Sequence, residues 1–158
     1  WPTFSKTVLV LLMLIGASAG STGGGIKVSR IVILAKSVKK ELKQYLHPHS
    51  ISKIKMDGKP VEHEVVRSIN VFLIAYLLIY AVSMLIVSLD NFDFTTTFTS
   101  VAATINNIGP GLDLVGPAAN FGILSVPSKL VLIFDMLAGR LEIFPLLLLF
   151  VPDTWRKF

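Results

Sequence analysis

The chain contains no cysteine and few charged residues. Without cysteine it can form no disulfide framework, cysteine-ligated zinc site, iron–sulfur cluster or thiol nucleophile. Charged residues make up 16% of its 158 residues and apolar residues 53%, whereas an average soluble domain has about 25% and about 45–50%. Disorder is excluded as well, because disordered chains combine low hydrophobicity with high net charge. The composition therefore indicates a membrane protein.

Charge is absent from residues 69–89, a run of 21 residues whose polar members are only asparagine, serine and tyrosine. About 20 apolar residues suffice to cross a hydrocarbon core about 30 Å thick. The run is predicted to be a membrane-spanning helix, since a core helix of a soluble protein usually keeps a polar face. A second span is predicted at 129–152, although this segment contains four charged residues.

Basic residues are absent from 90–124, which holds three aspartates. Residues 27–67 contain ten Lys or Arg and four Asp or Glu, a net charge of +6. Because loops rich in Lys and Arg stay in the cytoplasm, 27–67 and the C-terminus are predicted to be cytoplasmic and 90–124 to lie outside. The basic segment lacks interleaved aromatic residues, so no nucleic-acid partner is expected, and anionic lipid is its secondary partner.

A short hairpin is predicted within this cytoplasmic segment, over residues 51–64. Asp57 and Gly58 stand between two stretches of alternating polarity. Asp-Gly in that setting favours a two-residue turn, because the turn needs a positive φ at both positions.

Glycine interrupts the first apolar segment, where VLVLLMLI at 8–15 is followed by GASAGSTGGGIK at 16–27. Glycine costs a helix about 1 kcal/mol relative to alanine, so the three glycines at 23–25 predict a break. Non-helical backbone persists at membrane depth only where protein or water satisfies its polar groups, which predicts an adjoining cavity or pore. A phosphate-binding loop is disfavoured because Ile26 stands where its lysine belongs. Close helix packing through small residues remains an alternative.

A second interruption separates the two predicted spans. Residues 92–103 are too short to cross a membrane and are followed by TINNIGPGLD at 104–113. A span, a half-length helix, a glycine-containing loop and another span form the arrangement of a cation-selective pore, whose loop carbonyls replace the hydration shell of the ion. Gly109 can adopt a positive φ, and Pro110 needs no hydrogen-bond partner. Residues 104–111 are therefore predicted to be a filter, with an external type II turn as the alternative.

Arg140 lies near the middle of the last predicted span. A charge at that depth costs roughly 2.5–3.5 kcal/mol and indicates a function. Glu142 is two positions away and lies on another face of the helix. Arg140 is therefore predicted to face a water-filled interior, with an ion pair to Asp135 as the alternative. The histidines lack tight metal-ligand spacing and no nucleophile–base arrangement is present, so no enzyme activity is expected.

Three motifs, GASAGSTGGGIK at 16–27, TINNIGPGLD at 104–113 and MLAGRLEIFPLLLLF at 136–150, occur together in this order. With them the chain resembles the C-terminal part of the Trk/Ktr/HKT superfamily of potassium transporters, and is most similar to the membrane subunit of bacterial Trk systems. The resemblance implies an all-α integral membrane fold of M1–P–M2 pore repeats, each with a re-entrant pore helix and a filter loop. The implied domains are the second helix of the third repeat at 1–45, a cytoplasmic linker with the hairpin at 46–68, and a complete fourth repeat at 69–158 (M1 69–89, pore helix 92–103, filter 104–111, M2 129–152).

The resemblance also implies the roles of individual residues. Potassium would be bound by the backbone carbonyls of Asn107, Ile108 and Gly109. The implied filter residues are Asn106, Asn107, Ile108, Gly109, Pro110 and Gly111. The implied gate, a loop inside the membrane below the filter, comprises Gly16, Gly20, Ser21, Thr22, Gly23, Gly24, Gly25 and, beside the loop, Arg140.

The activity implied by the resemblance is potassium uptake across the inner cell membrane, driven by the membrane potential, with or without a second cation coupled by symport. The implied partners are membrane lipid, the remaining pore repeats, a second copy in a homodimer, and a cytoplasmic ring of nucleotide-binding regulatory subunits. No cofactor is expected in this chain, since NAD or ATP would be held by that ring. One filter loop of four cannot form the pore alone. A non-conducting membrane subunit or anchor is the alternative.

Overall fold

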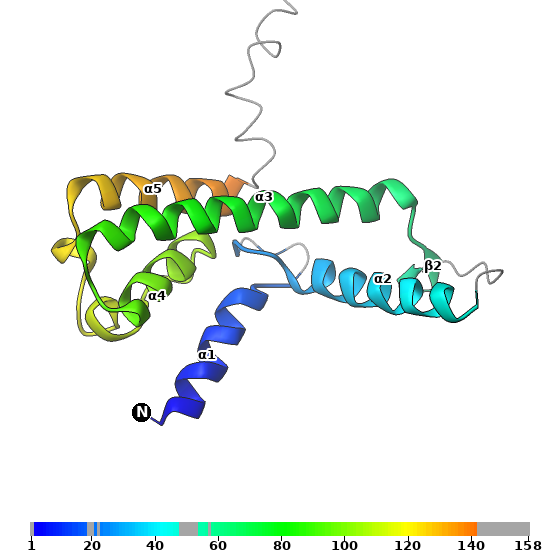
Figure 1. The fold of residues 1–158 in the computed structure, drawn as a ribbon, viewed down its shortest axis with the longest axis horizontal. Helices are drawn as coiled ribbons and strands as arrows, with labels where there is room; N and C mark the ends of the chain where they lie inside the picture. Colours follow the sequence, from blue (N-terminus) through cyan, green and yellow to red (C-terminus); the bar gives the residue numbers. More distant parts are fainter. Residues whose placement is uncertain (1, 19–20, 22, 48–53, 57, 142–158) are drawn as a thin grey trace, which may run out of the picture.

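The computed structural model describes residues 2–18, 21, 23–47, 54–56 and 58–141, and this part of the chain is mostly helical (Figure 1). Short 3-10 turns link the longer helices. The elements are α1 (Thr3–Ile15), α2 (Val28–Leu46), β1 (Lys55–Met56), β2 (Lys59–Pro60), α3 (His63–Val87), η1 (Ser88–Asp90), α4 (Phe94–Ile105), η2 (Asp113–Val115), η3 (Phe121–Ile123) and α5 (Val126–Leu141).

The longest helix is α3, which continues into η1. Together they form a helix of 28 residues that contains an 18-residue stretch with a mean hydropathy of 2.5, long and apolar enough to cross a membrane by length and composition. It begins at His63 rather than at the expected residue 69, because charged residues at the end of a span can remain in the polar interface while the backbone is already helical. It ends where Asn91 adopts a left-handed conformation with φ 56°.

Helix α5 returns antiparallel to α3, and the two lie side by side in Figure 1. It begins at Val126, three residues before the expected start at 129. Pro127 in the first turn explains this, since proline lacks the N–H that a first turn leaves unpaired. The expected end at 152 lies outside the described residues.

The short helix α4 lies against both α3 and α5 (Figure 1) and is buried from Thr96 to Ile105 except at Phe98. In this buried stretch the hydroxyl groups of Thr99, Ser100 and Thr104 bond to the helix backbone one turn earlier. The Thr99 hydroxyl donates to Thr95 O at 2.8 Å, and that of Ser100 to Thr96 O at 2.6 Å. Such bonds satisfy polar groups whose burial would otherwise cost free energy.

Two apolar clusters hold α4. At its last residue, Ile105 packs with Phe72 and Tyr76 of α3 and with Ala138 of α5. One turn earlier, Val101 belongs to a second cluster with Val87, Leu124 and Leu132. The C-terminal half of the short helix is therefore held between the two long ones.

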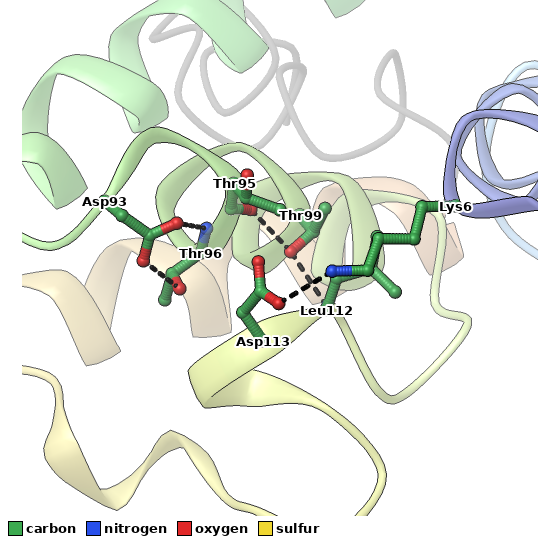
Figure 2. Close-up of polar contacts among 7 residues, drawn as sticks. All are labelled: Lys6, Asp93, Thr95, Thr96, Thr99, Leu112 and Asp113. Atoms are coloured by element: carbon green, nitrogen blue, oxygen red, sulfur yellow. Dashed lines mark hydrogen bonds and ion pairs between the residues drawn. The ribbon is translucent and has the colours of Figure 1, made fainter. Parts of the chain in front are cut away.

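Asp93 determines where α4 begins. Its carboxylate accepts hydrogen bonds from the Thr96 backbone N–H at 3.1 Å and from the Thr96 hydroxyl (Figure 2). This is an N-cap, which satisfies one of the N–H groups left unpaired by the first turn of a helix. The cap places the first residue of the helix at Phe94, two residues after the expected 92.

Asp93→Ala is expected to lower the melting temperature of the protein at pH 7. The hydrogen bonds from the Thr96 side chain and backbone lower the pKa of the Asp93 carboxyl below its usual range. A carboxylate with a lower pKa in the folded state adds stability above its unfolded pKa and loses it as the pH falls through the folded pKa. The difference between wild type and Asp93→Ala should therefore shrink below about pH 4. Asp93→Asn, which retains a capping oxygen, is the control, and a constant difference from pH 7 to pH 3 would contradict the assignment.

The predicted hairpin region contains two very short strands. β1 pairs antiparallel with β2, with Met56 opposite Lys59, and Gly58 in the turn has φ 78°. Residue 57 and residues 51–53 lie outside the described part of the chain. The Lys36 ammonium of α2 donates to Lys55 O at 2.8 Å, which ties the hairpin to that helix.

Candidate functional site

The segment after α4 is where the filter was predicted. Its first two residues, Thr104 and Ile105, are the last residues of α4 and not part of a loop. The chain then turns at Asn107, with φ 52°, and at Gly109, with φ 113°. A φ in this range favours glycine, and no atom lies within 4 Å of the position that a Cβ on Gly109 would occupy.

The Asn106 side chain is used inside the fold. It is 3% exposed, its Oδ1 accepts a hydrogen bond from the Tyr76 hydroxyl at 3.2 Å, and its Nδ2 donates to Ala102 O at 2.8 Å. A buried amide that is satisfied in this way has a structural role. Any contact of Asn106 with an ion would therefore be through its backbone.

The Asn107 side chain connects the same turn to the second long helix. Its Nδ2 donates to Met136 O of α5 at 3.0 Å. The Ile108 backbone N–H donates to Ala103 O at 2.9 Å, which ends the helix within the turn. The backbone of the predicted filter is thus anchored at its start to α4 and α5, while residues 108–110 are exposed on the described chain.

The far end of the predicted filter is also anchored. The Gly111 N–H donates to Val115 O at 2.8 Å, and the Leu112 N–H donates to the Thr99 hydroxyl at 2.9 Å (Figure 2). The next residue, Asp113, forms an ion pair with Lys6 of α1 at 3.2 Å, so the loop also contacts the first helix.

The glycine-rich segment predicted to be the gate separates α1 from α2. Helix α1 ends at Ile15, and Gly16 has φ 74°. Gly25 has φ 85°, and α2 begins at Val28, whose N–H donates to Ala17 O at 3.0 Å. Of the residues predicted for the gate, Gly20 and Thr22 lie outside the described residues.

Two glycines of this segment lie against the start of the predicted filter. A Cβ on Gly24 would lie 2.8 Å from Asn107 Nδ2 and 3.1 Å from Asn106 O. A Cβ on Gly25 would overlap the side-chain oxygen of Asn106. Only glycine allows this approach, so the predicted gate and the predicted filter are in contact.

Gly139 completes the contact from the side of α5. A Cβ at this position would overlap the backbone oxygen of Ile105, and one on Gly24 would lie 3.0 Å from Gly139 O. The last turn of α4, the glycine-rich segment and α5 therefore meet through backbone atoms.

A cavity of about 200 Å³ adjoins this junction. Arg140 lies on its wall with Ser21, Gly23 and Gly25 of the glycine-rich segment and Tyr76 of α3. The structure thus places Arg140 beside the predicted gate. Glu142 lies outside the described residues. Asp135, which is fully buried, accepts a hydrogen bond from the Ser83 hydroxyl at 2.8 Å.

Comparison with known proteins identifies the family. The model of the family described as "TrkH: Cation transport protein" matches residues 1–157. The chain belongs to this family. Among its relatives, the Trk system potassium uptake protein TrkH of Escherichia coli (strain K12) is 43% identical over 157 residues, and the TrkG protein of the same organism is 38% identical. Both matches cover 99% of this chain and 32% of the relative.

A solved structure supports the TrkH-family fold. The chain is similar to the crystal structure of the potassium transporter TrkH from Vibrio parahaemolyticus, with a TM-score of 0.83, 43% identity, and coverage of 99% of this chain and 33% of that one. The expected helical membrane class is thereby confirmed, and the resemblance to Trk-type transporters with it. The relatives are named as transport proteins, consistent with a non-enzyme. The chain spans about a third of their length.

Several residues of the site were not found from the sequence. Tyr76 and Thr99 each bond to a loop residue far along the chain, and Gly139 is required by a contact between helices. The signal for Gly139 was a glycine within an apolar segment, which often marks close packing. Tyr76 and Thr99 have no comparable signal.

Proposed function

We propose that the complete protein carries potassium across the inner cell membrane through a filter to which this chain contributes one loop. The observation that carries the proposal is the turn at residues 106–111, which follows a buried half-length helix and reaches a positive φ at Gly109. This loop lies on a chain whose relatives are named potassium uptake proteins. Such a loop suits ion binding because backbone carbonyls can replace the water around a cation.

The carbonyls of Asn107, Ile108 and Gly109 are the proposed potassium ligands. Asn106 holds the start of the loop through its side chain, and Pro110 with Gly111 turns the chain back towards α4. Three further loops from the rest of the protein would complete the filter, since one loop supplies oxygens on one side of an ion only.

The proposed gate is the glycine-rich segment 16–25 with Arg140. Its contact with Asn106 and Asn107 supports a position directly beside the start of the filter. Arg140 contributes a positive charge at the cavity next to this loop. A cation approaching the filter from that side would be repelled by it.

The segments of this chain also have proposed places in the pore repeats and in the membrane topology of the complete protein. Residues 1–45 would end the third pore repeat, 46–68 would link the repeats in the cytoplasm, and 69–158 would form the fourth. Segment 90–124 would face outside and the C-terminus the cytoplasm. The proposed partners are a second copy of the protein and a cytoplasmic regulatory ring that binds the nucleotides.

Gly109→Ser tests the filter. Serine at φ 113° is strained and would shift the neighbouring carbonyls, so we expect rubidium uptake into proteoliposomes containing the complete protein to lose its resistance to excess sodium. Gly58→Ser is the control, because Gly58 also has a positive φ, 78°, but lies in the hairpin. Unchanged selectivity in folded Gly109→Ser protein would exclude the filter role. Absence of uptake by folded wild-type protein would favour a membrane anchor or an obligatory missing partner.

A further inference from the structure

Thr99 connects the pore helix candidate α4 to the far end of the predicted filter. Its hydroxyl donates to Thr95 O within the helix at 2.8 Å and accepts the Leu112 N–H at 2.9 Å (Figure 2). Thr99 as a whole is 1% exposed. A single hydroxyl therefore uses both its donor and an acceptor lone pair, and it spans 13 residues along the chain.

The backbone next to this bond approaches α4 closely. A Cβ on Gly111 would lie 3.0 Å from Thr99 Oγ1, 3.2 Å from the Thr99 carbonyl carbon and 2.6 Å from a methyl group of Val115. Gly111 is itself buried, and its N–H donates to Val115 O. The returning limb of the loop is thus held against one position of the helix.

The opposite limb is held by different groups. Asn106 and Asn107 anchor the start of the loop to α3, α4 and α5. Between these anchors and Leu112, residues 108–110 are exposed. The separation between the two anchored ends determines how residues 108–110 are arranged, and Thr99 fixes one of these ends.

We infer that Thr99 is a positioning residue for ion selectivity: its hydroxyl fixes the Leu112 backbone and thereby the spacing of the carbonyls at 107–109. The inference deepens the proposed filter function and rests on it. Thr99 touches no ion. Its effect passes through the backbone of the loop, where small displacements change how well carbonyls replace water around potassium relative to sodium.

The test uses the complete protein and two measurements. Thr99→Val keeps the branched shape and removes the hydroxyl, so the partly buried Leu112 N–H loses its partner. We expect hydrogen exchange of the peptide containing Leu112 to become about tenfold faster, as for the loss of one hydrogen bond. Selectivity is measured as rubidium uptake without excess sodium divided by uptake with it. We expect this ratio in Thr99→Val to change from the wild-type value towards the value for Gly109→Ser.

Two variants serve as controls. Thr99→Ser retains the hydroxyl and should keep wild-type exchange and selectivity. Ser100→Ala removes a buried hydroxyl of the same helix that bonds to Thr96 O, and should also behave as wild type. A merely structural role for Thr99 would lower the melting temperature without changing the ratio of uptakes. If Thr99→Val does not accumulate in the membrane, Thr99→Ala removes the same hydroxyl without adding volume and is held to the same outcomes.

The possible failures are distinguishable. Unchanged exchange at Leu112 in Thr99→Val would overturn the inference whatever the transport result. Faster exchange with unchanged selectivity, while Gly109→Ser alters selectivity, would overturn the inference and leave the filter in place. Unchanged selectivity in both Thr99→Val and Gly109→Ser would overturn the filter proposal, and the inference with it.

Discussion

Replacing Gly139 by alanine is expected to destabilise the folded protein. Helix propensity alone would favour alanine by about 1 kcal/mol. Against this, the added Cβ overlaps the backbone oxygen of Ile105, and overpacking costs typically about 1–3 kcal/mol. The upper part of that range applies, because both groups belong to helix backbones and neither can rotate away. Helices α4 and α5 would therefore have to separate.

Thermal unfolding of the complete protein in detergent would measure this effect, as a lower melting temperature for Gly139→Ala than for wild type. Leu137→Ala is the control, since Leu137 lies on the same helix but is about half exposed. It should unfold close to the wild-type temperature. An unchanged or higher melting temperature for Gly139→Ala would show that the two helices do not meet closely at this glycine.

Gly25→Ala is expected to increase the rate of ion flux through the complete protein. Its Cβ would overlap the Asn106 side chain, and alanine is strained at φ 85°. A left-handed conformation costs a non-glycine residue about 1–2 kcal/mol. A cost of that size, imposed only while the loop lies against Asn106, shifts the balance towards a withdrawn loop by about 5- to 30-fold.

The uptake rate of rubidium into proteoliposomes is the measurement for Gly25→Ala. Gly58→Ala is the matched control, because Gly58 also has a positive φ, 78°, but has no atom within 4 Å of its Cβ position. Gly58→Ala therefore imposes the strain of a positive φ on alanine, without a steric overlap such as that between residue 25 and Asn106. Flux equal to wild type in folded Gly25→Ala protein would exclude a gating role for the segment. If Gly25→Ala lost flux because it misfolded, this variant would no longer support the gating role of the segment.

The helix starts carry local signals in the sequence, although predictions based on hydrophobicity misplaced two of them. Asp93, followed three residues later by a partner N–H, is an ordinary N-cap signal and places the start of α4 at Phe94. The expected start at 92 was wrong because it followed hydrophobicity instead of the cap. The start of α3 at His63 was missed in the same way, since the first apolar residue after Arg67 was taken for the first helical one.

The contacts of the candidate site could not be predicted in the same way. A glycine-rich segment in the sequence indicates a break in a helix. Which atoms pack so closely against each glycine that a side chain is excluded depends on tertiary packing. Gly25 meets Asn106, and Gly139 meets Ile105. The bond from Tyr76 to Asn106 joins residues 30 apart on different elements, and no periodicity within either helix encodes it.

The Lys6–Asp113 ion pair makes one contact of the loop sensitive to ionic strength. Both side chains are 38% exposed, and exposed pairs contribute about 0–1 kcal/mol and are screened by salt. The attachments of the loop to α4 and α5, by contrast, run through hydroxyl, amide and backbone groups without net charge. The shape of the loop should therefore vary little between dilute and saline surroundings, even as the attraction between α1 and the loop weakens with ionic strength.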